Sequence, residues 1–90
     1  MATHKSALKR HQQDLRRRQE NRLRRGRMRS AVKQYRQTLA NGDVDAARGM
    51  LNSTLAVIDR TAKAGAIHNN AADRAKSRLT VALNRVASAQ

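Results

Sequence analysis

The sequence of 90 residues contains no cysteine, proline, tryptophan or phenylalanine, and one tyrosine is its only aromatic residue. The absence of cysteine excludes disulfide bonds and thiolate metal sites. The near absence of aromatic side chains argues against a protein that binds single-stranded nucleic acid by stacking bases on aromatic rings. Because the chain also lacks alternating runs of β-branched residues, there is no strand signal, and we predict an all-α fold.

Long apolar runs and acidic clusters are missing as well. No stretch of 18 apolar residues exists, and the N-terminus lacks the apolar segment of a signal peptide, so we expect a cytoplasmic protein without a membrane partner. The six acidic residues are scattered, and the chain has no histidine, carboxylate and nucleophile set and no glycine-rich phosphate loop. We therefore predict no catalytic site, no cofactor and no small-molecule substrate. His4, His11 and His68 are too widely spaced to predict a metal site.

Positive charge is what the sequence has in excess. Twenty Lys and Arg against six Asp and Glu give a net charge of +14, which is typical of proteins that bind nucleic acid. Most of these cations precede Gln37, and three quarters of them are arginine, whose planar guanidinium binds phosphate oxygens bidentately. A merely solvated basic face is the competing interpretation, but the surplus exceeds what the solubility of a small domain requires.

The segment from Arg16 to Arg36 carries two stripes at helical spacing. The apolar stripe consists of Met28, Val32, Tyr35 and Leu39. The basic stripe, which we call the arginine ladder, consists of Arg18, Arg22, Arg25, Arg29, Lys33 and Arg36. Since the two stripes lie about 100° apart on a helix, one side of this segment needs a protein core and the other attracts anions. The phase of Tyr35 favours core packing over base stacking.

The rest of the chain predicts two shorter helices. Asn41-Gly42-Asp43 reads as a helix end followed by an N-cap, and Gly65 ends the next helix. We expect helices over residues 6–40, 44–64 and 70–87, with an Asn as the N-cap of the third. Their apolar faces are expected to be Val44, Ala47, Leu51, Leu55 or Thr54, Ile58 and Ala62 in the second helix, and Ala72, Ala75, Leu79, Ala82 or Leu83, and Val86 in the third.

Helix length then decides the architecture. Two shorter helices cannot cover the long one, so we predict an up-down-up three-helix bundle in which the basic half of the first helix projects. The division within the single domain 1–90 is a basic extension over 1–27 and a bundle core over 28–90. After Met1, that extension has only Leu8, Leu15 and Leu23 as large apolar residues, which are too few to attach it to a core. Gly26 either allows RNA backbone to approach closely or is simply tolerated.

Landmarks along the whole chain are similar to one family. They are Lys5-Ser6-Ala7, Lys9-Arg10, Asn21, Arg24-Arg25, Arg29, Lys33, Gly42-Asp43, Asp59-Arg60, Gly65, Ile67-His68, Asn70, Ala72, Arg74, and Lys76 through Leu79. Together, in register, they resemble the bacterial small-subunit ribosomal protein S-twenty family (bS-twenty). The resemblance implies a three-helix bundle that binds small-subunit ribosomal RNA, contributes to early folding of its 5′ domain and reaches the long penultimate stem. Ala64, Asn69, Ala71 and Asp73 depart from the more basic family pattern, which implies thinner contact from the third helix.

These observations predict a structural, non-enzymatic protein of the small ribosomal subunit that bridges RNA helices, with ribosomal RNA and other small-subunit components as partners. The expected RNA-binding residues are Lys5, Lys9, Arg10, Arg16, Arg17, Arg18, Arg22, Arg24, Arg25, Arg27, Arg29, Lys33, Arg36, His68, Asn70, Arg74, Lys76 and Arg78. The alternative is a DNA-binding architectural protein with the same charge. An amphipathic membrane or partner-helix module would need a broader apolar face along the basic half.

Overall fold

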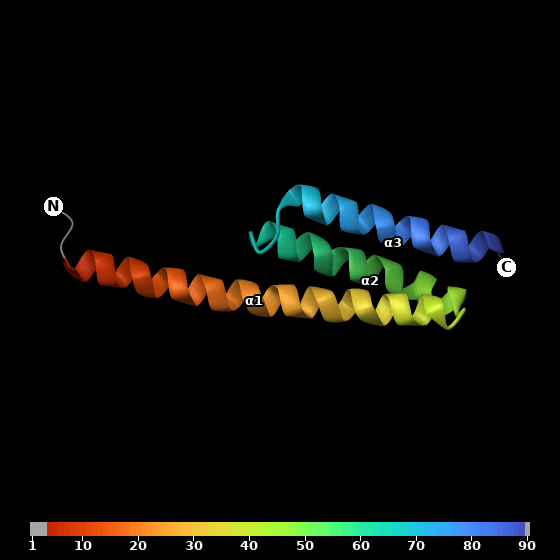
Figure 1. Cartoon of the computed structure of the whole chain (residues 1–90), viewed down its shortest axis with the longest axis horizontal. Coiled ribbons are helices and arrows are strands. Elements are labelled where there is room, and N and C mark those ends of the chain that lie inside the picture. The colour runs from red at the N-terminus through yellow and green to blue at the C-terminus, as the bar shows by residue number, and fades with distance from the viewer. Residues whose placement is uncertain (1–3, 90) are drawn as a thin grey trace.

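Three α-helices joined by two short turns make up the computed structural model, which describes residues 4–89 (Figure 1). α1 spans His4–Ala40, α2 spans Val44–Lys63 and α3 spans Asn69–Ala89, and they run up, down and up. No strand occurs within the described residues. The all-α bundle predicted from the sequence is therefore confirmed, while the first three residues and the last residue of the expected domain 1–90 lie outside the described part.

Both turns depend on a glycine in the left-handed conformation. Gly42 follows α1 with a φ of 80°, and Gly65 follows α2 with a φ of 81°. The N–H of Gly42 donates to the carbonyl oxygen of Leu39 at 2.9 Å, and Gly65 makes the equivalent bond at the end of α2, so each helix ends in a Schellman motif. Asp43 then caps α2, because its Oδ1 accepts the N–H of Ala46 at 3.1 Å. The predicted helix end and restart are thus confirmed.

The core lies between the C-terminal half of α1 and the two shorter helices. Tyr35, Ile58 and Leu79 are the largest fully buried side chains, one from each helix. The Tyr35 hydroxyl donates a hydrogen bond of 2.8 Å to the carbonyl oxygen of Leu79, and burial raises the pKa of this phenol. Met28 and Val32 are half-buried against the same cluster, which confirms the predicted apolar stripe.

The buried face of α2 is more polar than its sequence pattern suggested. Thr54, rather than Leu55, is buried, and Thr61 is buried beside the half-buried Ala62. Each threonine hydroxyl donates to the carbonyl oxygen four residues earlier, at 2.9 and 2.7 Å, so neither leaves a polar atom unpaired in the core. Because this local hydrogen bond satisfies the hydroxyl, a threonine can occupy a buried position on α2 for which hydrophobicity alone favours the adjacent leucine or alanine.

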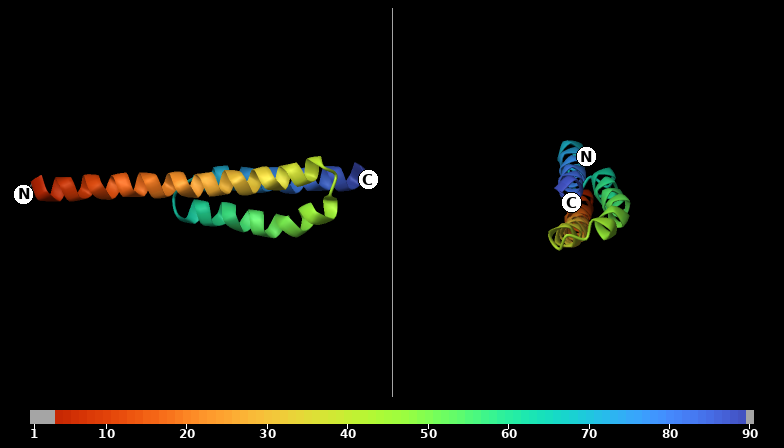
Figure 2. Two further views of the ribbon diagram at one scale, coloured as in Figure 1. Left: turned by 90° about the horizontal axis from the view of Figure 1, so that it is seen from below. Right: turned by 90° about the vertical axis from the view of Figure 1, so that its right-hand side faces the viewer.

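α2 is the helix that holds the bundle together, because α1 and α3 each pack mainly on α2 and only slightly on one another (Figure 2). An ion pair of 2.7 Å between Asp59 of α2 and Lys76 of α3 adds to the second of these contacts. The hydrogen bond to Asp59 raises the pKa of Lys76.

α1 is much longer than its companions. It has 37 residues, against 20 in α2 and 21 in α3, and the molecule measures 66 × 20 × 14 Å. Every described residue before Asn21 is exposed, and Leu8 and Leu23 are 61 % and 62 % exposed. The N-terminal half of α1 therefore extends beyond the turn between α2 and α3 (Figure 1). No helix in the described part is long and apolar enough to cross a membrane.

Replacing Tyr35 by Phe tests the buried hydrogen bond. We expect Tyr35→Phe to lower the free energy of unfolding by about 1 kcal/mol near pH 7, measured by urea denaturation. Because the pKa is raised in the folded state, the unfolded chain releases the phenolic proton first, so the stability of the wild type falls as the pH rises above the ordinary value of 10.0. The variant should not show this decrease in stability. The same free energy of unfolding for the two proteins at all pH values would contradict the buried hydrogen bond of Tyr35.

The glycines provide a matched pair of substitutions. Gly65→Ala should destabilise the protein by about 1 to 2 kcal/mol, because alanine is strained at the positive φ of this turn. Gly26→Ala should stabilise it by about 0.5 to 1 kcal/mol, since this position is inside α1 and open space surrounds it. Thermal unfolding followed by circular dichroism measures both, and changes of the same sign would refute this interpretation of the turn.

Candidate nucleic-acid interface

The basic side chains of the first third of the protein lie on the projecting part of α1 and its junction with the bundle. All of the expected RNA-binding residues from Lys5 to Arg18 are exposed there: Lys5, Lys9, Arg10, Arg16, Arg17 and Arg18. Further along α1, the ladder members Arg22, Arg29, Lys33 and Arg36 are also exposed. The helix therefore presents its cations to solvent over nearly its entire length.

Arg24 and Arg25 of α1 make contacts within the protein. Arg25 Nη1 donates a hydrogen bond of 3.1 Å to the carbonyl oxygen of Ala66, in the turn between α2 and α3. Arg24 Nη1 lies 3.9 Å from a carboxylate oxygen of Glu20 and donates to Asn21 at 3.3 Å. The half-buried Arg25 thus attaches α1 to the turn and contributes to the stability of the fold.

His68 directly precedes α3 and caps its N-terminus, which corrects the expectation that an Asn would be the N-cap. Its Nδ1 accepts the backbone N–H of Asn70 at 3.0 Å, and its carbonyl oxygen accepts the N–H of Ala72 at 3.1 Å. A histidine can replace Asn here because its ring nitrogen reaches the same orphan N–H group at the helix start. The other ring nitrogen, Nε2, belongs to an exposed residue and is the atom that could meet an outside group.

Four of the predicted RNA-binding residues lie on α3, and their surroundings differ. Asn70 is exposed in its first turn. Arg78 is exposed, and Arg74 is exposed with its Nε donating to the carbonyl oxygen of Asn70 at 3.4 Å. Lys76 is half-buried, and its Nζ lies 2.7 Å from Asp59 and 3.7 Å from Asp73. Two carboxylates therefore neutralise Lys76 within the protein, which leaves it less available to a phosphate than its neighbours.

Two basic grooves flank α1. The α1–α2 groove is lined by Arg24 and Arg27 from α1 and by Arg60 from α2, with Val57 and Thr61 beside them. Sequence reasoning did not select Arg60, because its proximity to Arg24 and Arg27 depends on how α2 crosses α1. Its only sequence signal was its inclusion in the Asp59-Arg60 landmark.

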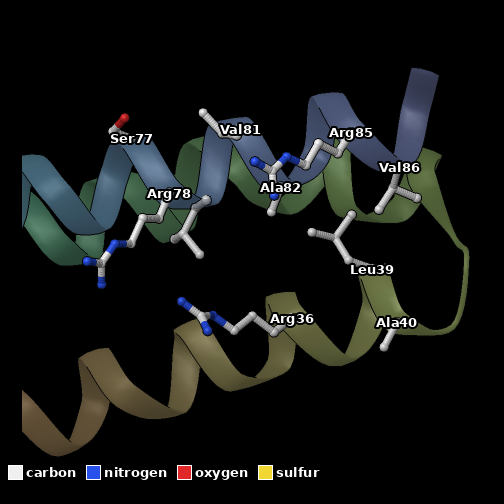
Figure 3. Close-up of a pocket in the computed structure, with 10 residues that line it drawn as sticks. Arg36, Leu39, Ala40, Ser77, Arg78, Val81, Ala82, Arg85 and Val86 are labelled. Carbon is white, nitrogen blue, oxygen red and sulfur yellow. The ribbon is translucent and has the colours of Figure 1, made fainter. Parts of the chain in front are cut away.

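The α1–α3 groove lies where those two helices make few contacts. Arg36 of α1 projects into it from one wall, and Arg78 and Arg85 line the opposite wall on α3 (Figure 3). A second hollow continues along α1 and shares Arg36, adding Arg29 and Lys33. Sequence reasoning missed Arg85, although its spacing of seven residues from Arg78 places both on the same side of α3.

Chemically, this arrangement suits a polyanion. The exposed arginines offer bidentate donors along one helix and in two grooves, whereas no three His, Asp or Glu side chains gather as a metal site within residues 4–89. A helical protein whose long basic helix extends past a small core belongs to the class of basic proteins typical of nucleic-acid complexes.

Comparison with known proteins identifies the family. The family model described as Ribosomal protein S20 matches residues 2–84. The small ribosomal subunit protein bS20 of Nitratidesulfovibrio vulgaris (strain DP4) is 45 % identical over 97 % of this chain and 100 % of its own length. The proteins of the same name from Solidesulfovibrio magneticus and Aquifex aeolicus are 43 % and 39 % identical, over 99 % and 94 % of this chain and 100 % and 90 % of their own lengths. The chain belongs to the ribosomal protein S20 family, which confirms the resemblance and the expected ribosomal localisation.

The contact between Arg25 and Ala66 can be tested by comparing two neighbouring ladder arginines. Arg25→Ala should lower the free energy of unfolding by about 1 kcal/mol, because it removes a half-buried, charge-assisted hydrogen bond. Arg22→Ala removes the same charge from an exposed position and should change stability by less than about 0.5 kcal/mol. Urea denaturation of the free proteins measures both values, and identical stability of the two variants would show that Arg25 contributes nothing to the fold.

Proposed function

We propose that this protein is a structural, non-enzymatic constituent of the small ribosomal subunit that binds small-subunit ribosomal RNA directly through the arginine ladder. The observation that carries the proposal is the exposure of Arg18, Arg22 and Arg29 on a helix that extends beyond its own core. A cationic helix without a protein partner is stabilised when phosphates neutralise its charge. Membership in the ribosomal protein S20 family supports the same role.

In this proposal residues 1–27 are the RNA-binding extension and residues 28–90 are the core that orients it. Arg25 lies at the junction between them, and the ladder members Arg29, Lys33 and Arg36 continue the basic surface along the core. Recognition is of RNA shape and backbone, because the deep major groove of A-form RNA resists side chains and the only Phe, Tyr or Trp side chain, Tyr35, is fully buried.

Bridging of RNA helices is the second part of the proposal. The α1–α2 groove and the α1–α3 groove lie along different sides of α1, and both have arginines on both walls. RNA segments on these two sides would repel one another through their phosphates. Cations placed between them reduce that repulsion, so the protein stabilises a close approach of RNA helices during assembly.

A pair of charge-matched double variants tests the function. Arg22→Ala with Arg29→Ala removes two exposed ladder cations, and we expect about tenfold or greater loss of affinity for small-subunit ribosomal RNA. The control, Arg48→Ala with Lys63→Ala, removes two exposed cations from α2 and should weaken binding much less. Filter binding at a fixed salt concentration gives both affinities, and circular dichroism checks that helicity is unchanged.

Equal losses in the two double variants would mean that net charge, rather than the ladder, determines binding. Duplex DNA of the same length, tested at the same salt concentration, separates the proposal from the DNA-binding alternative. Tighter binding of the wild type to the DNA than to the structured RNA would favour an architectural DNA-binding protein.

A further inference from the structure

We infer that the α1–α3 groove holds one phosphodiester strand of the RNA, bound between Arg29, Lys33 and Arg36 on α1 and Arg78 and Arg85 on α3. The inference rests on the proposed function and assigns a second wall to the binding surface. Figure 3 shows the geometry that suggests it, since Arg36 extends from α1 into the same space that Arg78 borders on α3.

Charge complementarity is the first argument. None of the residues that line the two hollows of this groove is acidic, so its cations have no counter-charge there. This differs from the α2–α3 side of the bundle, where Lys76 is neutralised by Asp59 and Asp73. Like charges on the two walls of a groove repel, and an anionic strand between them removes that repulsion.

The spacing of the two walls is the second argument. Arg29 and Arg36 are seven residues apart on α1, and Arg78 and Arg85 are seven residues apart on α3. Seven helical residues rise about 10 Å, so each wall presents its cations over the same length. α1 and α3 run in the same direction, so one strand can follow both sets (Figure 1). Arg36 shares a hollow with Arg78 and Arg85, and Arg29 lies further along α1 in the adjoining hollow.

The charge of the groove favours a nucleic-acid strand over a protein helix, because both walls carry arginines and none of the lining residues is acidic. Apolar side chains lie between these cations, with Leu39, Val81 and Val86 in one hollow and Met28 and Val32 in the other. Riboses can lie on these apolar side chains while the phosphates meet the arginines. The groove is also continuous with the ladder, because Arg29, Lys33 and Arg36 belong to both.

Arg78→Ala with Arg85→Ala tests this assignment in the full-length protein. We expect about tenfold weaker binding to small-subunit ribosomal RNA and a salt dependence reduced by about 1.4 in the slope of log K against log salt, as for two lost phosphate contacts. The stability of the free variant should stay the same or rise, since repulsion across the groove is removed. A merely structural role of these arginines would lower stability and affinity together. The control remains Arg48→Ala with Lys63→Ala.

Because the chain has no cysteine, a single introduced thiol can carry a tethered iron chelate that cleaves nearby RNA. Val81 lines the groove and is 45 % exposed. From a chelate on Val81→Cys we expect strong cleavage at one or two short RNA segments. From Asn52→Cys, on the exposed side of α2, cleavage of those segments should be weak.

These experiments distinguish failure of the proposed RNA binding from failure of the groove assignment. If the proposed function is wrong, the wild type itself does not bind the RNA. If the wild type binds, but the Arg78 and Arg85 double variant binds as tightly as the control and Val81→Cys gives no specific cleavage, the groove assignment is overturned. An acidic protein helix would then be the better candidate for the groove.

Discussion

The position of Gly65 sets how far α1 can be covered. α2 begins directly after the turn at Gly42, runs antiparallel to α1, and ends at a second Schellman motif after 20 residues. It therefore packs along only about the last 20 of the 37 residues of α1, and the turn that follows meets α1 at Arg25. The uncovered length of α1 is thus a geometric consequence of where one left-handed glycine stops α2.

This constraint explains the distribution of residue types. Where α2 and α3 cover α1, the sequence supplies Met28, Val32, Tyr35 and Leu39, and the Tyr35 hydroxyl is paired with a carbonyl oxygen of α3. Beyond the turn, no described side chain of α1 is buried, and cations replace the apolar stripe. The small core fixes the direction of a long helix, and that helix presents its charge at a distance from the core. A cationic segment that is already helical suits the proposed binding of ribosomal RNA better than an unfolded basic tail, because less conformational entropy is lost on binding.

Local rules in the sequence were sufficient for the helix ends, the apolar stripe and the excess charge. Gly42 was predicted to end a helix because glycine can adopt a left-handed φ. Tyr35 was predicted to lie in the core because of its helical spacing from Val32 and Leu39. The misses involve contacts between distant segments: Lys76 as the partner of Asp59, Arg60 beside Arg24, and Arg85 near Arg36. Each depends on how one helix is rotated against another, which residue spacing within a single helix does not determine. The burial of Thr61 and the role of His68 as the N-cap of α3 were missed for a different reason. A hydrogen bond to the backbone makes each residue suitable for a position that simple preference gives to another residue type.

The salt dependence of binding to small-subunit ribosomal RNA tests the central claim most directly, since it counts the phosphates that the protein neutralises. If the arginine ladder and the two grooves together engage about eight phosphates, log K should fall against log salt with a slope near −6 to −7. A slope shallower than about −2 would mean that few phosphates are contacted, and the account of an exposed cationic helix built to bind RNA would be contradicted.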